Sequence, residues 1–193
     1  MKFDYPIGAT PLDPDEIAGL IPTHITAQAQ LNEWEQVNII KAETWLFTTK
    51  HSTILTTAFL QRLHKKMFDQ TWRWAGKFRQ TDKNIGINWM AIPIQLKDLL
   101  DDVRYQIAQK SYSLDEIATR FHHRLVLVHP FANGNGRHAR LMTDILLTSN
   151  QHARFTWGRN NLSSKNETRE RYIKSLRAAD QYNYSELLEF VRL

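Results

Sequence analysis

The chain has no cysteine among its 193 residues, so disulfide bonds and thiolate chemistry are excluded. It also lacks any stretch of about 18 consecutive apolar residues, the length that a membrane-spanning helix needs. The first residues include Asp4 and Pro6 and no apolar run of the kind that a secretory signal contains. We therefore expect a cytoplasmic globular protein with no membrane span.

Positive charge is present only in modest excess. The formal net charge is +5, no basic run exceeds two residues, and Lys65-Lys66 is the one adjacent lysine pair. Proteins that bind nucleic acid concentrate lysine and arginine in patches. We interpret the dispersed charge as a solvated surface or a site for a phosphorylated small molecule, and we do not expect nucleic acid as a partner.

Proline is concentrated at one end of the chain. Four of the six prolines fall in the first 22 residues, and proline removes backbone donors and resists helix interiors. This predicts an irregular N-terminal arm over residues 1–25. The remainder, residues 26–193, has the size expected for one domain. The chain as a whole is 42% hydrophobic, which is enough for one sizeable core.

Helical periodicity dominates that remainder, which predicts an all-α domain. Leu31, Trp34, Val37 and Ile40 recur at three-residue steps and predict a helix over residues 26–49. Further helices are expected over residues 52–68, 95–109, 113–128, 164–179 and 184–192. The clearest begins at a capping box of Ser113 and Glu116. Its apolar face comprises Leu114, Ile117, Ala118, Phe121, Leu125 and Val128.

One segment interrupts the helical pattern. Residues 77–88 hold turn-forming side chains at positions 82–84 between two short mixed runs. Such a pattern is typical of a β-hairpin. We therefore predict one small hairpin within the helical domain.

Residues 129–140 carry the strongest functional pattern: His-Pro-Phe-Ala-Asn-Gly-Asn-Gly-Arg-His-Ala-Arg, followed by an apolar helix body. Pro130 disfavours helix at His129, so the preceding helix should end there. Arg137 and Arg140 are three residues apart and share a helix face near its N-terminus, where free N–H groups favour anions. Two guanidiniums at that end suit a triphosphate. The alternatives are a salt-bridged surface for the arginines and a structural role for the histidine.

This stretch resembles the signature of the Fic (Fido) family, His-x-Phe-x-Asp/Glu-Gly-Asn-Gly-Arg-x-x-Arg. The matching positions are His129, Phe131, Gly134, Asn135, Gly136, Arg137 and Arg140. Asn133 departs from the pattern, because the family has a carboxylate there. Residues 31–36 and 74–78 are also similar to a bacterial subgroup called mobile mystery protein B.

The resemblance implies a protein adenylyltransferase that moves AMP from MgATP to a Ser, Thr or Tyr hydroxyl of a target protein. By this interpretation His129 is the general base and Phe131 anchors the loop in the core. Gly134, Asn135 and Gly136 would cradle the α- and β-phosphates. Arg137 and Arg140 would hold the β- and γ-phosphates and stabilise the leaving pyrophosphate.

Asn133 makes the metal contribution weaker than in the family. The family carboxylate binds Mg²⁺, which prefers charged oxygen ligands, whereas an amide oxygen brings no net charge. We therefore predict weak magnesium binding and reduced activity. Two alternatives stay open: a catalytically weak or inactive nucleotide-binding protein that acts through a partner, and nucleotidyl transfer from another nucleoside triphosphate.

The resemblance also assigns roles outside the motif. The hairpin would be a flap that docks the target segment, with Lys77, Arg79, Asn84, Ile85, Gly86 and Ile87 as its contact positions. The alternative is an ordinary connecting hairpin. The subgroup resemblance further suggests a small helix-turn-helix companion protein, as in toxin–antitoxin pairs.

Fic proteins are often restrained by a helix whose glutamate pairs with a motif arginine, here Arg137. Gln30 has the right spacing after Thr26 but no charge, and Glu33 and Glu35 follow on the same predicted helix. These three are the candidate inhibitory residues. The simpler interpretation of the two glutamates is a solvated acidic face.

Overall fold

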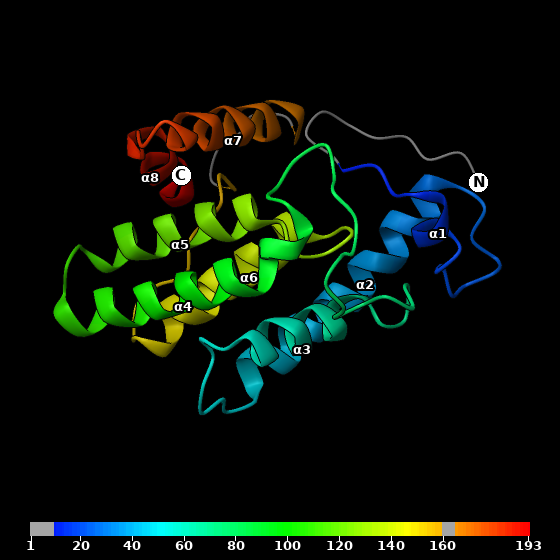
Figure 1. Ribbon diagram of the computed structural model, residues 1–193, viewed down its shortest axis with the longest axis horizontal. Coiled ribbons are helices and arrows are strands. Elements are labelled where there is room, and N and C mark those ends of the chain that lie inside the picture. The colour runs from blue at the N-terminus through cyan, green and yellow to red at the C-terminus, as the bar shows by residue number, and fades with distance from the viewer. Residues whose placement is uncertain (1–9, 160–164) are drawn as a thin grey trace.

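The computed structural model describes residues 10–159 and 165–193, and within these ranges the chain is helical and contains no β-strand. The predicted all-α class is therefore confirmed (Figure 1). The helices are α1 (Pro14–Ile17), α2 (Gln28–Thr48), α3 (Thr57–Phe68), the 3₁₀ turn η1 (Trp89–Ala91), α4 (Ile92–Gln109), α5 (Leu114–Val128), α6 (Asn135–Ser149), α7 (Lys165–Asp180) and α8 (Ser185–Arg192).

Helices α5 and α6 form the centre of the domain. Helix α5 begins as predicted, since Ser113 Oγ accepts a hydrogen bond from the Glu116 N–H at 3.2 Å. Its predicted apolar face is buried apart from the half-buried Leu114. Helix α6 packs on α5, α3 and α2, while α4 flanks α5 and α8, paired with α7, packs against another side of α5 (Figure 1).

The predicted apolar face of α2 is wrong beyond its first residue. Trp34, Val37 and Ile40 are 38%, 52% and 52% exposed. Each three-residue step falls about 60° short of a full turn, so the three steps from Leu31 to Ile40 drift about halfway around the helix. The buried residues instead keep to one face, and they are Leu31, Glu35, Asn38, Ile39, Ala42 and Leu46.

The first described residues lie against the loop that follows α3. They contain the single-turn helix α1, and an isolated antiparallel bridge joins Leu20 to Trp72. Lys83 Nζ bonds the Asp13 and Glu16 carboxylates at 2.7 and 2.6 Å. Residues 1–9 of the predicted arm lie outside the described residues.

The predicted β-hairpin over residues 77–88 is wrong: the segment is an irregular loop. The buried guanidinium of Arg79 takes the place of a cross-strand ladder. It donates to the carbonyls of Thr81 and Ile87 within the loop and of His129 beyond it. Because a side chain satisfies these carbonyls, the two halves of the loop do not pair.

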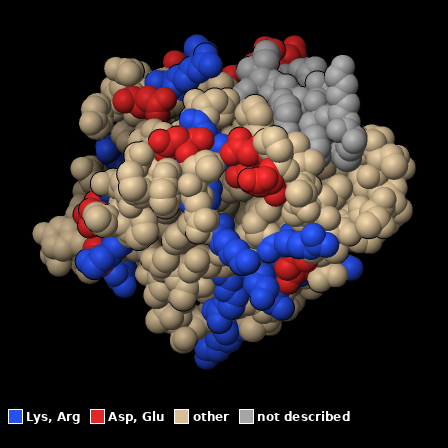
Figure 2. Space-filling view, turned by 45° about the vertical axis from the view of Figure 1, so that its right-hand side comes forward, with Lys and Arg blue, Asp and Glu red and all other residues tan. Residues whose placement is uncertain are grey.

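Charges that are dispersed in the sequence gather on the folded surface. Figure 2 shows lysine and arginine side chains concentrated in the lower part of one face, with acidic groups beside them. Among the described residues, no helix has the length and apolar character that crossing a bilayer requires.

Candidate active site

The motif forms a sharp corner between α5 and α6. Helix α5 ends at Val128, and His129 follows with a left-handed φ of 52° while its N–H donates to the Leu125 carbonyl at 3.3 Å. The predicted helix end at His129 is therefore confirmed. Left-handed backbone is uncommon outside glycine and is typical of functional corners. Phe131 is fully buried and stacks on His64 with ring centroids 3.7 Å apart, as its anchoring role requires.

Two residues fix the loop that leads into α6. Gly134 has φ 77°, and a Cβ there would lie 2.5 Å from Phe68 Cζ, so the position requires glycine. The Asn135 side chain accepts from the Phe131 N–H at 2.9 Å and donates to the Phe131 carbonyl at 2.8 Å. Both ends of the Asn135 amide therefore hold the loop, and a phosphate contact by this residue stays a prediction.

The first backbone N–H groups of α6 have no hydrogen-bond acceptor within the helix. The first α-helical bond of α6 runs from the His138 N–H to the Gly134 carbonyl at 2.9 Å. The N–H groups of Asn135, Gly136 and Arg137 precede it and point toward the N-terminal end. Such a helix end attracts anions through its N–H groups and its dipole.

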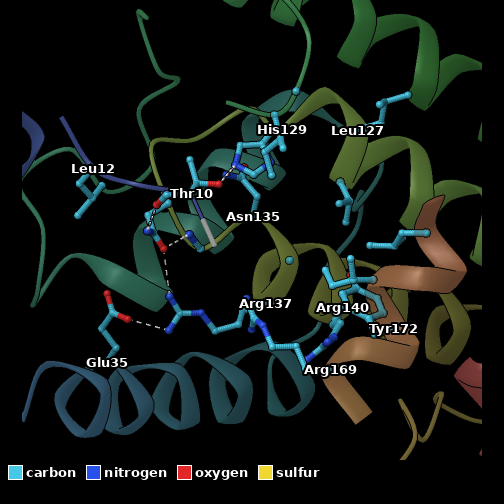
Figure 3. A pocket seen from close by; sticks show the side chains of 18 of the residues that line it. Thr10, Leu12, Glu35, Leu127, His129, Asn135, Arg137, Arg140, Arg169 and Tyr172 are labelled. Carbon is cyan, nitrogen blue, oxygen red and sulfur yellow. Dashed lines mark hydrogen bonds and ion pairs between the residues drawn. The ribbon is translucent and has the colours of Figure 1, made fainter. Parts of the chain in front are cut away.

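The start of α6 lies at a cavity of about 560 Å³ (Figure 3). The residues that line this cavity include His129, Gly136, Arg137 and Arg140. The sequence prediction that the histidine and the two arginines share one site is consistent with this geometry. Arg140 lies 4.6 Å above the Tyr172 ring of α7. A volume of this size is typical of a small-molecule site.

Helix α7 brings two further guanidiniums to the cavity, those of Arg169 and Arg177. These charges were not predicted from the sequence, because no regular spacing relates α7 to a motif about 30 residues earlier in the chain. Burial, then Arg140 and Arg137, lowers the pKa of Arg169. Several cations converging on one cavity favour a polyanionic ligand.

His129 is almost completely buried, and it faces a hydroxyl. Its Nε2 lies 2.9 Å from Thr10 Oγ1, a contact between residues 119 apart in the chain. Burial, followed by the charge of Arg79, lowers the pKa of His129 to about 4. The imidazole is therefore neutral near pH 7, as a proton acceptor must be. Thr10 was missed because nothing in the local sequence relates it to the motif.

Glu35 brings a carboxylate to the cavity from α2. Its Oε2 lies 2.7 Å from Arg137 Nη1, and its Oε1 accepts from Trp72 Nε1 at 2.7 Å (Figure 3). The expectation of a solvated acidic face is therefore wrong for Glu35, which is 5% exposed. Glu33 is exposed, and the Gln30 side chain instead accepts from the N–H groups of Thr26 and Ala27.

Asn133 does not fit the metal role predicted for it. Its Oδ1 accepts from the Gly134 N–H at 2.6 Å and from Arg137 Nη2 at 3.4 Å, while its Nδ2 donates to the Thr10 carbonyl at 3.3 Å. An oxygen that already faces two donors is a poor ligand for a hard cation. The described residues also contain no group of three or more His, Asp or Glu side chains suited to a metal.

The residues predicted for the flap divide into three groups. Ile85 and Gly86 line the cavity, and a Cβ on Gly86 (φ 97°) would lie 2.6 Å from His129 Cβ. Arg79 lies beneath the loop and holds the His129 carbonyl at 2.7 Å. Lys77 and Asn84 are exposed and Ile87 is half-buried, outside the residues that line the cavity.

Comparisons with known proteins agree with this geometry. The family model for the Fic/DOC family matches residues 54–147, which include the motif. Over 121 residues the chain is 35% identical to protein adenylyltransferase fic-1 of Caenorhabditis briggsae. That match takes in 61% of this chain and 22% of the relative, so the chain spans about a fifth of the relative's length.

Solved structures share the fold over most of the chain. BepC of Bartonella tribocorum, solved with bound AMPPNP, has a TM-score of 0.72 and 19% identity over 93% of this chain and 97% of its own. An N-terminal Fic domain of a Bartonella quintana protein with bound ADP has a TM-score of 0.67 and 19% identity over 88% and 86%. The family match and the shared fold together show that the chain contains a Fic (Fido) domain.

Proposed function

We propose that this protein is an adenylyltransferase that moves AMP from ATP to a Ser, Thr or Tyr hydroxyl of a protein. The observation that carries the proposal is the shared cavity, where the neutral His129 imidazole faces the start of α6 and the guanidiniums of Arg137 and Arg140. The family match and the fic-1 relatives, which are named adenylyltransferases, support the same reaction class.

In this proposal His129 Nε2 takes the proton of the acceptor hydroxyl. The hydroxyl oxygen then attacks the α-phosphorus of ATP and forms a phosphodiester, while pyrophosphate leaves with the electrons of the broken P–O bond. The low pKa of His129 keeps the base unprotonated at neutral pH. Its left-handed backbone and the bond from Arg79 to its carbonyl fix the direction of the ring.

The polyphosphate would lie along the start of α6. The backbone N–H groups of Asn135, Gly136 and Arg137 would bind its oxygens, and Arg140 would bind the distal phosphates. Arg169 of α7, which lies near Arg140 in the cavity (Figure 3), would add positive charge as pyrophosphate forms. Fixed donors of this kind stabilise developing negative charge without having to reorganise.

Glu35 would restrain the enzyme by holding Arg137. A triphosphate needs this guanidinium, yet the Glu35 carboxylate already occupies one face of it at 2.7 Å. Binding of ATP would therefore require the phosphate to displace or outcompete a buried carboxylate. We propose Glu35 as the inhibitory residue among the three that the sequence suggested.

The proposal is tested by incubating the protein with α-labelled ATP and magnesium, with and without a cell lysate, and following label on protein. Mass spectrometry should find a gain of one AMP on a hydroxyl side chain. His129→Ala should abolish the label, a loss of about a hundredfold or more for a general base. The same variant should bind ATP, because the phosphate site does not include the imidazole.

Other donors and the absence of transfer are outcomes of the same experiment. Label from UTP or GTP in preference to ATP would change the donor and keep the reaction class, since backbone donors and arginines bind phosphates rather than bases. Tight ATP binding without transfer from any donor would refute the enzymatic proposal. It would favour the nucleotide-dependent binding protein that the amide of Asn133 suggests.

A further inference from the structure

The hydroxyl of Thr10 lies where the acceptor of the proposed reaction must be. Thr10 Oγ1 is 2.9 Å from His129 Nε2, within the range required for proton transfer to a general base (Figure 3). Thr10 is 6% exposed, so bulk water does not separate the two groups. The base therefore already has a hydroxyl partner that belongs to the same chain.

The backbone at Thr10 and in the residues that follow it is held by two sets of contacts. The Asn133 amide donates to the Thr10 carbonyl at 3.3 Å. Three residues further on, Asp13 accepts from Thr81 Oγ1 at 3.0 Å and from Lys83 Nζ at 2.7 Å. These contacts fix the Thr10 carbonyl and the chain that follows it, so the position of the hydroxyl beside the base does not depend on one bond.

The hydroxyl and the phosphate site open into the same space. Thr10 and Leu12 line the cavity together with Gly136, Arg137 and Arg140. A triphosphate bound at the start of α6 would therefore have Thr10 as a neighbouring nucleophile. A tethered nucleophile reacts as if it were at very high concentration, with effective molarities that reach about 10⁵ M or more in well-oriented cases.

Asn133 has a specific part in this arrangement. A carboxylate at this position could not donate a hydrogen bond, so its oxygen would oppose the Thr10 carbonyl oxygen. The amide that departs from the Fic pattern is the donor that the arm requires. The substitution that weakens the metal site therefore also holds a hydroxyl beside the base.

We propose that Thr10 is a modification site of this enzyme, and that its own active site transfers a nucleoside monophosphate to it within one chain. This inference rests on the proposed nucleotidyl transfer. Thr10 Oγ1 gives its proton to His129 Nε2 and forms a phosphodiester bond with the α-phosphorus, as the bond to pyrophosphate breaks. The reaction ends after one transfer per chain, because the product keeps its nucleotide beside the base.

The test uses purified protein, magnesium and α-labelled ATP, with peptide mapping by mass spectrometry. The peptide that contains Thr10 should gain one AMP, and the label should stop at one per chain. Thr10→Val keeps the shape of the side chain and removes the hydroxyl, so it should lose at least about nine tenths of the label. Thr10→Ser restores a hydroxyl and should restore the label.

A mixing experiment tests whether the transfer occurs within one chain. The His129→Ala chain supplies an intact Thr10 without a base, and the Thr10→Val chain supplies a base without the acceptor. The intramolecular proposal predicts no label on Thr10 of the His129→Ala chain after mixing. It also predicts a wild-type labelling rate that does not change when the protein is diluted tenfold. Label on the His129→Ala chain would overturn the intramolecular step.

Failure of this inference can be told apart from failure of the proposed function. If a wild-type or Thr10→Val chain labels lysate proteins, and wild-type Thr10 carries no nucleotide, the proposed function stands and the Thr10 site is wrong. If Thr10→Val keeps its full self-label on another residue, the site is likewise wrong. If no chain transfers label to any protein, both proposals are refuted.

Discussion

The two walls of the cavity differ in how the chain builds them. One wall, which we call the floor, is the continuous stretch 128–140, whose internal bonds join near neighbours such as Asn135 and Phe131. The other, which we call the cover, comprises Thr10, Leu12, Glu35 and Ile85–Gly86, drawn from three distant segments. The difference indicates that the groups suited to an anion are positioned by local sequence, whereas the groups that face them depend on the whole fold.

The walls also differ in charge. The floor presents helix N–H groups and the guanidiniums of Arg137 and Arg140, which attract a polyphosphate. The cover presents a carboxylate to Arg137 and a hydroxyl to His129. His129 and Arg137 of the floor thus each face a partner from the cover, and each partner resembles part of what the reaction would bring.

The largest expected effect is a loss of stability in acid, which arises from buried histidines in the floor and elsewhere in the core. Burial lowers the pKa of His64, His122, His129 and His138, three of them to values of about 3 to 4. The unfolded chain takes up these protons below about pH 6.5, whereas the folded chain does not. Stability is therefore full above pH 6.5 and falls as pH decreases from 6.5 toward 4. Between pH 7.5 and 5.5 we expect a loss of about 3 to 5 kcal/mol in the free energy of unfolding.

Urea unfolding at closely spaced pH values measures this loss, and its slope gives the number of protons taken up on unfolding. His138→Gln should lower that number by about one, because it removes one neutral buried imidazole. His24→Gln is the matched control, since His24 is exposed. A free energy of unfolding that stays constant between pH 7.5 and 5.5 would contradict the four buried neutral histidines.

The next effect tests the floor as a phosphate site. Arg140→Gln should weaken ATP binding by about 10- to 100-fold, because a charge-assisted bond contributes about 1.5 to 3 kcal/mol. Arg140→Lys keeps the charge without the forked geometry, so its ATP affinity should lie between those of the wild type and Arg140→Gln. Calorimetric titration with ATP measures the affinities. Arg171→Gln on the outer face of α7 is the control for net charge, and an equal loss there would assign the effect to general electrostatics.

The floor could be predicted from sequence because its geometry is set within a dozen residues. Pro130 ends one helix, Gly134 allows the turn, and Arg137 and Arg140 follow at helical spacing, so neighbouring residues decide the outcome. The cover could not be predicted in the same way. The contact between Thr10 and His129 spans 119 residues and that between Glu35 and Arg137 spans 102, and no local pattern encodes such pairs.

The two errors in the fold have the same origin. On α2 the buried positions of Glu35 and Asn38 are polar, so the apolar pattern pointed to Trp34, Val37 and Ile40 instead. Burial of these polar groups is possible because distant partners, such as Trp72, satisfy them. In the loop 77–88, one arginine satisfies the carbonyls that a hairpin would have paired.

A smaller effect concerns the cover at Arg137. Glu35→Gln can still accept from Trp72 but no longer neutralises the guanidinium, so ATP affinity should rise by about 3- to 10-fold, or up to about 1.4 kcal/mol. Glu33→Gln on the same helix removes an exposed carboxylate outside the cavity and should leave affinity unchanged. Titration with ATP compares the two. Weaker binding by Glu35→Gln would indicate that the carboxylate orients Arg137 for phosphate rather than restraining it.

The smallest effect separates the two roles that meet at Asn133. Asn133→Asp adds a charged oxygen and removes the donor to the Thr10 carbonyl, whereas Asn133→Ala removes the whole amide and adds no charge. With ADP or a non-hydrolysable ATP analogue bound, Mg²⁺ affinity measured by calorimetry should rise several-fold in the Asp variant relative to the Ala variant, because a carboxylate is the better ligand for a hard cation. Equal Mg²⁺ affinity in the two variants would mean that the charge at this position does not reach the metal. The amide would then be explained by its bond to the arm alone.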